Sequence, residues 1–445
     1  MSQLKRPVEL RLIEEIFSRT LLPALTYFVI AILVVFWKFR SERFGVELQV
    51  GGLFMAALCV ARWIIGYQGK NKKINLEKYL PALNVIVVLS GGLWALIFAA
   101  VIWEAPVTSL QMFVCFGITN GILGAIPNSL IGNPRIQFYF CVCLGLVPTI
   151  FFTYRFLHDG LSFDYLSLSL LLILNFVYVV VLGRKLRAGL LLIFEQQERI
   201  QQDLMAAKDI QRSLLPPTNQ DFGPAQLEIL YRPCEELSGD FFETHVHEGH
   251  LLFYIADVTS HGTAAAQVTY LLKAAFRNII ADLGSEIDIA EVTQKICEEY
   301  VSYKLNYAIS LFTASYNLKD GHLQFVTSNF PNPLLVSENG VEILFSERNP
   351  VIDAAHFDPA ERFQKSVAVL PHRSRLFAFT DGAYEFRKSK TGREFGFRKF
   401  SKLLSDNQAE NWTTSVSHEL ERANGSAVFE DDMTILCLHR YGENA

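Results

Sequence analysis

The feature of this sequence that most limits its fold is a series of long apolar segments within the first 183 residues. Each is about 17 to 25 residues long, the length that an α-helix needs to cross a bilayer. Such segments must be helical, because a bilayer core offers no water to the backbone hydrogen-bonding groups. The sequence therefore predicts a six-helix transmembrane domain over residues 1–183. The spans are expected at about 21–37, 48–67, 81–103, 107–131, 136–157 and 163–183.

Basic residues between the segments indicate which way this domain faces. The side that holds both chain ends carries more Lys and Arg than the opposite side, and basic residues favour the cytoplasmic side of a membrane. The opening residues show no small-residue cleavage site, so we expect no cleaved signal peptide. The sequence predicts a multi-pass protein of the cell inner (cytoplasmic) membrane, surrounded by membrane lipid, with both termini cytoplasmic.

Polar residues within the spans are few. The interior of the segments holds no Asp or Glu, which disfavours a transport function, since transporters usually keep an intramembrane carboxylate. Arg62 and Arg155 lie near segment ends, where we expect their side chains to reach toward water. Three asparagines either line a ligand pocket or hold helices together, and the second role is favoured. They are Asn84, Asn120 and Asn175.

Residues 184–216 have the pattern of a helical linker. Apolar residues recur at every seventh position from Leu186 to Leu214, which is typical of a coiled-coil seam. Gln197 and Gln211 fall on the intermediate positions and weaken this seam. Two interpretations stay open: a homodimer through the linker, and one amphipathic helix lying on the domain that follows. Pro216 and its neighbour Pro217 end the helix.

Residues 217–445 alternate strand-like runs with amphipathic helices, which predicts an α+β domain of antiparallel sheets covered by helices. The turn Lys319-Asp320-Gly321 predicts a hairpin. We expect strands at 227–232, 241–247, 251–257, 307–317, 322–328, 333–337, 366–370, 374–380 and 433–440. Helices are expected at 263–283, 288–305, 396–405 and 412–424.

Four carboxylates in this half lie at the ends of apolar strands. They are Asp240, Asp257, Asp381 and Asp431, each beside a glycine, a second acid or a small polar run. Each alone is an ordinary turn residue. Together they would converge at one end of a sheet, and such a cluster is costly unless cations neutralise it. The pattern therefore predicts a site for hard divalent ions.

The order of these motifs resembles the bacterial SpoIIE/RsbU-type branch of the metal-dependent (PPM) serine/threonine phosphatases, over about residues 208–440. The motifs that carry the resemblance are Asp209-Ile210-Gln211-Arg212-Ser213-Leu214-Leu215-Pro216, Ser238-Gly239-Asp240-Phe241, Ile255-Ala256-Asp257-Val258, Gly262 with Ala264-Ala265, Thr380-Asp381-Gly382 with Glu385, and Asp431-Asp432-Met433-Thr434. The membrane half resembles no family, beyond the plan of a membrane sensor fused to such a domain.

The resemblance implies a PPM-type phosphatase domain, two antiparallel β-sheets sandwiched by α-helices, with two Mn²⁺ or Mg²⁺ ions at one edge. It implies that Asp257 bridges both ions, with the carbonyl of Val258 as a further ligand. Asp240 would hold one ion, largely through water, and Asp381 and Asp431 the other. Asp432 is expected to support these ligands without binding an ion itself. Ions held in this way activate a water for attack on a phosphoserine or phosphothreonine.

The sequence departs from the family pattern at three places. Ser238 and Ser260 stand where relatives have glycine, and Asn329-Phe330 replaces a Gly-His pair. All four core carboxylates are retained, so we expect an active enzyme. The departures also motivate an alternative, a membrane receptor whose phosphatase-like half only binds a partner.

Histidines offer two weaker candidates. His245, His247 and His250 have a spacing that could bind zinc, but their place in a hairpin favours a solvated turn. His261 could donate a proton to the leaving group, although an exposed helix-start residue is the favoured interpretation. The formal net charge of -5 gives no support to nucleic-acid binding. The seven scattered cysteines are expected to be reduced.

These observations lead to one functional hypothesis, a membrane-anchored serine/threonine protein phosphatase. The resemblance implies a phosphorylated STAS-type anti-sigma factor antagonist as its substrate, in a partner-switching pathway. We expect the transmembrane domain (1–183) to be sensory. It would act through the linker (184–216) on the phosphatase domain (217–445).

Overall fold

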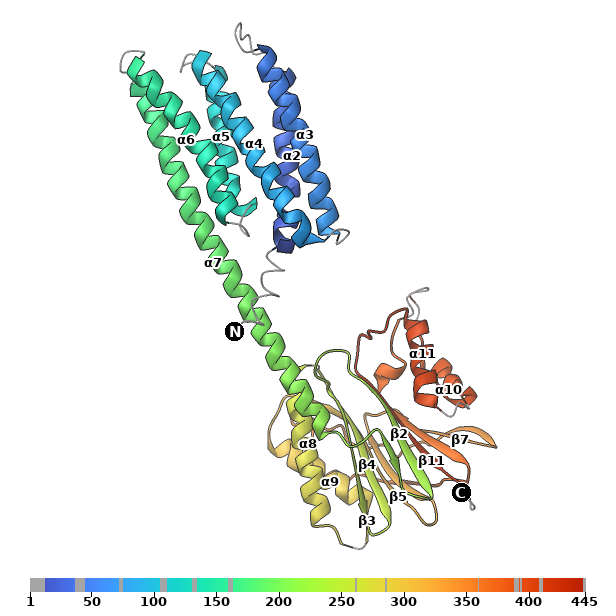
Figure 1. Ribbon diagram of the computed structural model, residues 1–445. Helices are drawn as coiled ribbons and strands as arrows, with labels where there is room; N and C mark the ends of the chain where they lie inside the picture. Colours follow the sequence, from blue (N-terminus) through green and yellow to red (C-terminus); the bar gives the residue numbers. More distant parts are fainter. Residues whose placement is uncertain are drawn as a thin grey trace. The chain divides into compact units, whose positions relative to one another are not determined.

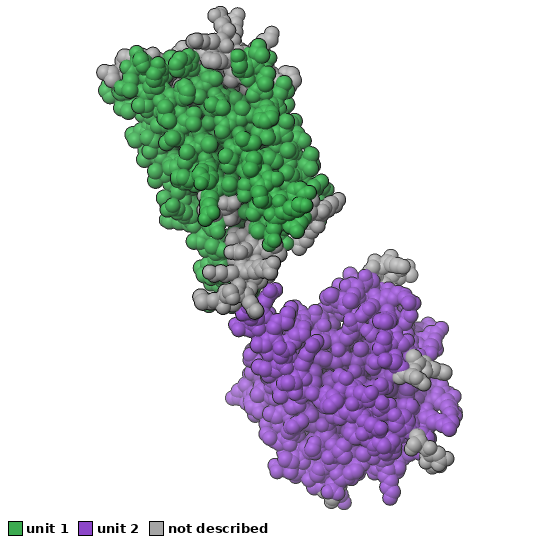
Figure 2. Space-filling model, viewed as in Figure 1, with its two compact units in different colours: residues 1–199 green, residues 200–445 purple. Residues whose placement is uncertain are grey.

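The structure is a computed structural model of the whole chain. It describes residues 13–36, 45–71, 75–104, 110–129, 134–158, 163–260, 262–284, 286–358, 360–387, 392, 394–407 and 411–442. His261, most of the basic N-terminal segment and the basic residues at 38, 40 and 43 lie outside the described residues. The chain divides into two compact units, Met1–Arg199 and Ile200–Ala445 (Figure 2).

The first unit is helical throughout its described elements. Hydrophobic side chains from its helices pack into one shared core. The elements are α2 (Leu21–Phe36), α3 (Gly45–Lys70), α4 (Leu76–Glu104), α5 (Leu110–Ser129), α6 (Pro134–His158) and the first part of α7 (Phe163–Leu214), shown in Figure 1.

Among the described residues, five helical segments are long and apolar enough to cross a membrane. These are Ile13–Ile32, Gln49–Lys70, Leu76–Ala100, Arg135–His158 and Phe163–Leu214. The remaining predicted span, 107–131, contains the 20-residue helix α5, which is not among these five, and its two ends lie outside the described residues. Six spans therefore stay a prediction, and so does the orientation of the termini.

Polar side chains inside the first unit contact other helices. Asn175 donates to Asn120 (Nδ2 to Oδ1, 2.6 Å), which confirms that these two asparagines connect helices. Arg62 is only 2% exposed, and its Nε donates to Thr20 Oγ1 over 2.7 Å. The expectation that Arg62 reaches toward water is therefore wrong, because its guanidinium finds a hydroxyl and the ring of Tyr27 inside the unit.

Helix α7 is 52 residues long and contains both the last predicted span and most of the predicted linker. No break occurs at residue 183, since Gly183 is compatible with a helix and leucine-rich sequence continues on both sides. The helix ends at Leu214, two residues before Pro216, as expected. Ile193 and Ile200 of the predicted seam are 51% and 58% exposed, whereas Leu214 packs against the core of the second unit.

The second unit contains two antiparallel sheets. A six-stranded sheet has the order β1-β2-β11-β10-β7-β8, and a five-stranded sheet has the order β3-β4-β5-β6-β9. The first consists of β1 (Asn219–Asp221), β2 (Ala225–Arg232), β7 (Leu334–Ser337), β8 (Gly340–Ile343), β10 (Ser374–Phe379) and β11 (Met433–Arg440). The second consists of β3 (Asp240–His247), β4 (His250–Val258), β5 (Ile309–Asn317), β6 (His322–Ser328) and β9 (Ser366–Val369).

Alternation along the strands builds the layers of this unit. Leu251, Phe253 and Ile255 of β4 face the core between the two sheets, whereas Leu252 and Tyr254 pack on the opposite face. That outer face is covered by α8 (Thr263–Ala281) and α9 (Ile289–Ser302), seen beside β3 and β4 in Figure 1. Helices α10 (Phe397–Asp406) and α11 (Trp412–Asn424) cover the outer face of the six-stranded sheet.

The two sheets sandwiched by helices confirm the predicted architecture of the C-terminal half. Its three cores consist of residues from this unit, so residues 200–445 have what an independently folding domain needs.

Candidate active site

Strand register places two of the candidate carboxylates side by side. Asp240 opens β3 and Asp257 lies near the end of β4, and the antiparallel register pairs these two residues directly. Asp257 also pairs with Ser310 on β5. The abrupt change from apolar to polar residues after β4 is therefore the point where the five-stranded sheet meets the site.

The six-stranded sheet supplies the other acids from the matching ends of two of its strands. Asp381 begins the short 3-10 helix η1 (Asp381–Ala383) just after β10, and Asp431 and Asp432 directly precede β11. These strands are antiparallel neighbours, and Thr380 N donates to Thr434 O over 3.0 Å. The end of one strand therefore lies beside the start of the other.

Asp240 is held in place by two threonines that the sequence analysis did not single out. Its Oδ2 accepts hydrogen bonds from Thr380 Oγ1 (2.8 Å) and Thr434 Oγ1 (2.7 Å). Asp240 is 1% exposed, and its Oδ1 is buried without a hydrogen-bond partner. Both threonines belong to the quoted motifs. Their positions next to the acids in the sequence were the one sign that they contribute to the site. A buried carboxylate oxygen without a partner is costly, and a cation would satisfy it.

Asp432 ties together the backbone behind the site. Its Oδ1 accepts from Cys234 N (2.8 Å) and its Oδ2 from Gly239 N (2.7 Å), and the residue is 4% exposed. Because both oxygens already accept backbone N–H groups, Asp432 is suited to positioning the segment that carries Asp240. Its own N–H donates to Asp431 Oδ1 over 2.8 Å.

The electrostatics of the site show that its acids lie close enough to repel one another. Burial, with Asp381, Asp431 and Asp432 nearby, raises the pKa of Asp257 to about 7. Burial and the charges of Asp257 and Asp432 raise the pKa of Asp240 well above its usual range. Cations bound here would remove this repulsion.

The donor set fits hard divalent ions. Carboxylate and carbonyl oxygens are the ligands that Mg²⁺ and Mn²⁺ prefer. Cys234 Sγ lies within 4.8 Å of carboxylate oxygens of Asp431 and Asp432, which would admit a softer metal. Burial and these acids raise the pKa of the Cys234 thiol to about 12, so the thiol is protonated in the metal-free site.

Close backbone contacts shape the loops around the acids. A Cβ at Gly239 would lie 2.8 Å from Ser260 O and 3.0 Å from Val258 O, so only glycine allows these carbonyls to approach. A Cβ at Gly382 would lie 2.0 Å from Asp432 O. Val258 closes β4 and is buried, with its carbonyl beside Gly239.

Two departures from the family pattern keep a glycine-like backbone. Ser260 has φ of 115° and Asn329 has φ of 49°, a region that L-residues rarely adopt. Asn329 tolerates this conformation, and its Nδ2 donates to Ser310 Oγ over 3.1 Å. At Ser238, the third departure, the hydroxyl accepts a hydrogen bond from Asp240 N over 3.1 Å. Hydrogen bonds therefore hold Ser238 and Asn329 in place, whereas strain is stored at Ser260.

The remaining histidine candidates lie away from this cluster. His247 and His250 are paired across the β3–β4 hairpin, where Glu248 and Gly249 form the turn with positive φ. His247 Nε2 contacts Gly284 O at 3.1 Å. Within the described residues, the one group of His, Cys, Asp or Glu whose ligand atoms all lie within 4.8 Å of one another is Cys234, Asp431 and Asp432. It contains none of these histidines, which supports a turn at 245–250, and of the four predicted carboxylate ligands it contains only Asp431.

Residues 247–441 match the family model described as stage II sporulation protein E (SpoIIE). Protein IcfG of Synechocystis is 20% identical over 267 residues, which cover 54% of this chain and 41% of IcfG. The chain thus spans about two fifths of the length of this curated relative.

Solved structures of similar fold include two bacterial phosphatase domains. The SiaA-PP2C domain of Pseudomonas aeruginosa is 21% identical, with a TM-score of 0.48, and the match covers 56% of this chain and 99% of that domain. The PP2C domain of SpoIIE from Bacillus subtilis, solved with a fragment of its regulatory domain, is 15% identical, with a TM-score of 0.42 and coverage of 50% and 63%.

The family match and the acids at the ends of the two sheets support a metal-dependent phosphatase domain of the PPM type in the C-terminal half. More narrowly, the similarity over residues 247–441 is to the SpoIIE family.

Proposed function

We propose that this protein is a membrane-anchored phosphatase that removes phosphate from serine or threonine of a cytoplasmic regulatory protein. The observation that carries the proposal is the carboxylate cluster, in which Asp240 has a buried oxygen without a partner and Asp257 is repelled by three other acids. Folding brings these carboxylates together from both sheets. Burying them side by side costs free energy, and bound cations would offset that cost.

Specific residues would hold the ions. Asp257 pairs with Asp240 across β3 and β4, and the charges of Asp381 and Asp431 also act on it, which suits it to bridge two Mn²⁺ or Mg²⁺ ions. Val258, the next residue, would add its carbonyl. When bound, two such ions lower the pKa of a water and neutralise phosphate oxygens. Thr380 and Thr434 fix the orientation of Asp240, and Asp432 fixes the backbone at Gly239.

The substrate class follows from the family. The resemblance to SpoIIE/RsbU-type phosphatases supports a phosphorylated STAS-type antagonist protein, acting in a partner-switching pathway that controls a sigma factor or another output. The five long apolar helical segments support anchoring in a membrane. The predicted excess of basic residues on the side of both termini supports a phosphatase domain inside the cell.

Regulation would reach the site through the last turns of α7. Gln211 is 3% exposed and exchanges two hydrogen bonds with the backbone of Ser238: Gln211 Nε2 donates to Ser238 O (2.9 Å), and Ser238 N donates to Gln211 Oε1 (3.1 Å). Lys273 of α8 donates to Leu214 O and pairs with Glu243 of β3. The end of α7 thus holds the segment two residues before Asp240. A change in α7, by a signal from the membrane unit or by pairing of its exposed Ile193 and Ile200 in a homodimer, would alter the site.

Phosphate release from a serine-phosphorylated STAS-domain protein tests the proposal, with residues 200–445 and Mn²⁺. We expect Asp257→Asn and Asp381→Asn to lower the rate at least about 100-fold, because each removes a negative ligand. Asp282→Asn, at an exposed aspartate just after α8, is the matched control and should keep the wild-type rate. Equal activity in the wild type and all three variants would contradict the proposed mechanism.

The strained loop motivates a second candidate function, a receptor whose phosphatase-like half binds a partner without catalysis. Ser260 holds a backbone conformation that favours glycine, and strain there could displace the loop that follows Asp257. Calorimetric titration of Mn²⁺ into residues 200–445 separates the two functions. Heat of binding at or below millimolar Mn²⁺ supports the enzyme, and no uptake supports the receptor.

A further inference from the structure

A pocket within the first unit has the composition of an anion site. It lies between α6 and α7, has a volume of about 210 Å³, and is lined by Arg135, Gln137, Phe138, Tyr139, Val180 and Arg184. The two arginines come from different helices, and both are exposed. The described lining residues include no carboxylate, so none of them neutralises the two positive charges.

A buried amide in the same pocket lacks a partner. Gln137 is 5% exposed, and its Nε2 is buried with no hydrogen bond. The amide lies directly against α7, since a Cβ at Gly183 would come within 1.8 Å of Gln137 Nε2. Glycine at 183 therefore makes the room that this donor occupies. A buried donor without an acceptor is costly, and an acceptor oxygen in the pocket would satisfy it.

The volume and the donor types limit the ligand. The pocket has room for several water molecules but falls below the roughly 300 Å³ of a site for a drug-sized molecule. Two guanidinium groups, an amide N–H and the hydroxyl of Tyr139 are donors suited to the oxygens of a phosphate group. Arg135 also lies in the first turn of α6, where the helix dipole favours an anion.

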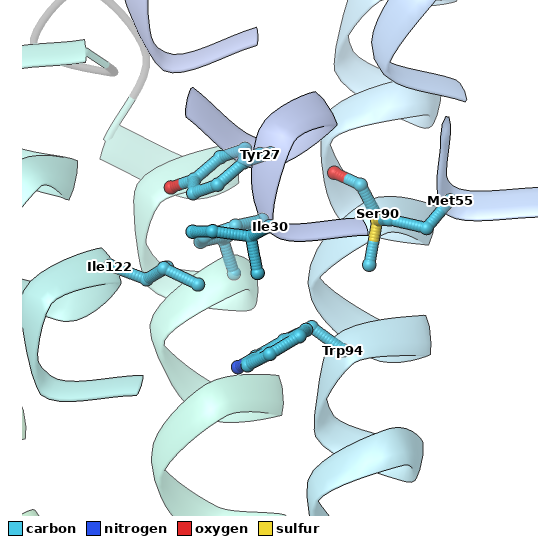
Figure 3. A pocket seen from close by; sticks show the side chains of 7 residues that line it. Tyr27, Ile30, Met55, Ser90, Trp94 and Ile122 are labelled. Carbon is cyan, nitrogen blue, oxygen red and sulfur yellow. The ribbon is translucent and has the colours of Figure 1, made fainter. Parts of the chain in front are cut away.

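A second pocket of this unit differs in volume and in charge. It lies among Tyr27, Ile30, Met55, Ser90, Trp94, Ile122 and Phe140, and is shown in Figure 3. Its volume of about 10 Å³ is the space of a single water, and no charged residue lines it. It is a packing defect of an apolar core, so the features of the α6–α7 pocket are not general to the unit.

We propose that the α6–α7 pocket binds a phosphate-type anion, with Arg135 and Arg184 as the charged ligands and Gln137 as a neutral donor. The anion is the headgroup phosphate of an acidic phospholipid or a free soluble phosphate. The predicted topology places both arginines at the cytoplasmic face, where acidic headgroups attract basic residues. Because Arg184 lies on α7, the bound anion connects α6 to the helix that continues to the phosphatase domain.

Thermal unfolding of the full-length protein in detergent tests this site. The midpoint is followed against added phosphatidylglycerol, phosphatidylcholine and inorganic phosphate. We expect an anion to raise the unfolding midpoint of the wild type. Arg135→Gln and Arg184→Gln should need an anion concentration at least tenfold higher for the same rise. Gln137→Leu keeps the charge and the approximate volume and should weaken the effect several-fold. The control is Lys185→Gln, which removes a neighbouring exposed charge outside the lining and should stay within twofold of the wild type.

The ligands separate the two sources. A response to phosphatidylglycerol but not to phosphatidylcholine or inorganic phosphate identifies a lipid headgroup. A response to inorganic phosphate with the same dependence on the variants identifies a soluble phosphate. The proposal is overturned if no anion shifts the midpoint, or if Lys185→Gln weakens the response as much as Arg184→Gln does. These outcomes do not depend on phosphatase activity.

Discussion

Gln211→Met tests whether the end of α7 supports the metal site. Methionine is unbranched and close to glutamine in size, so it can fill the same space, but it makes neither hydrogen bond to Ser238. The Ser238 N–H and C=O would both lose their Gln211 partner. An unsatisfied buried polar group costs about 1–3 kcal/mol, so the two together cost about 2–6 kcal/mol of docking free energy.

That cost is large on the scale of domain stability, about 5–15 kcal/mol in total. It falls on the segment that leads to Asp240, so it should appear both as lower stability and as weaker Mn²⁺ binding. The assay is urea unfolding of residues 200–445, with calorimetric Mn²⁺ titration of the same protein. We expect a loss of at least about 2 kcal/mol in unfolding free energy and a Mn²⁺ affinity at least about tenfold lower.

Gln202→Met is the matched control, because Gln202 lies on the same helix and is exposed. It should change unfolding free energy by less than about 0.5 kcal/mol. If Gln211→Met behaves like this control in both assays, α7 does not support the site. If stability falls while Mn²⁺ affinity is unchanged, the contact is structural only and the proposed route of regulation is wrong.

Three further predictions concern residues 200–445. Ser260→Gly removes the strain at φ of 115° and should stabilise the domain by about 1 kcal/mol without loss of phosphatase rate; denaturant unfolding with a rate assay checks both. Gly382→Ala would place a Cβ 2.0 Å from Asp432 O. It should lower the unfolding free energy by about 1–3 kcal/mol and the phosphatase rate at least tenfold. Wild-type values of both would show that the backbone moves away from this contact at no cost. Asp257 has a folded-state pKa of about 7 against an ordinary 3.8, so the metal-free domain binds an extra proton and loses up to about 4 kcal/mol as pH rises from 4 through 7. Asp257→Asn should therefore stabilise the metal-free domain more at pH 8 than at pH 5, and an equal effect at both would contradict the raised pKa.

Strand patterns in the second unit were predictable because each strand alternates between two packed layers. β4 is the clearest case, with odd residues in one core and even residues in another. β1 and β8 were missed, since they are three and four residues long and mostly exposed, so neither carries an apolar pattern. The continuity of α7 was also missed, because the change from apolar to charged sequence at residue 183 marks a change of surroundings and not of secondary structure.

Site residues were predictable where a motif placed an acid at a strand end. The threonines that orient Asp240 were not, because a hydroxyl gives no pattern by itself and Thr380 and Thr434 meet only after β10 and β11 pair. Gln211 shows the same limit, since a glutamine on a heptad position indicates a weak seam, whereas its bonds to Ser238 depend on tertiary packing. Arg62 of the first unit shows the same limit. Its position near a segment end predicted contact with water, whereas its hydrogen bond to Thr20 depends on how the helices pack.

The number of Mn²⁺ ions bound per chain tests the central claim most directly. Calorimetry on residues 200–445 should show binding of two ions to the wild type and loss of that binding in Asp257→Asn, because the charges of Asp381, Asp431 and Asp432 all act on Asp257. Binding in Asp257→Asn with wild-type stoichiometry and affinity would contradict the account, since the ions would then be held elsewhere than by the acids at the ends of the two sheets.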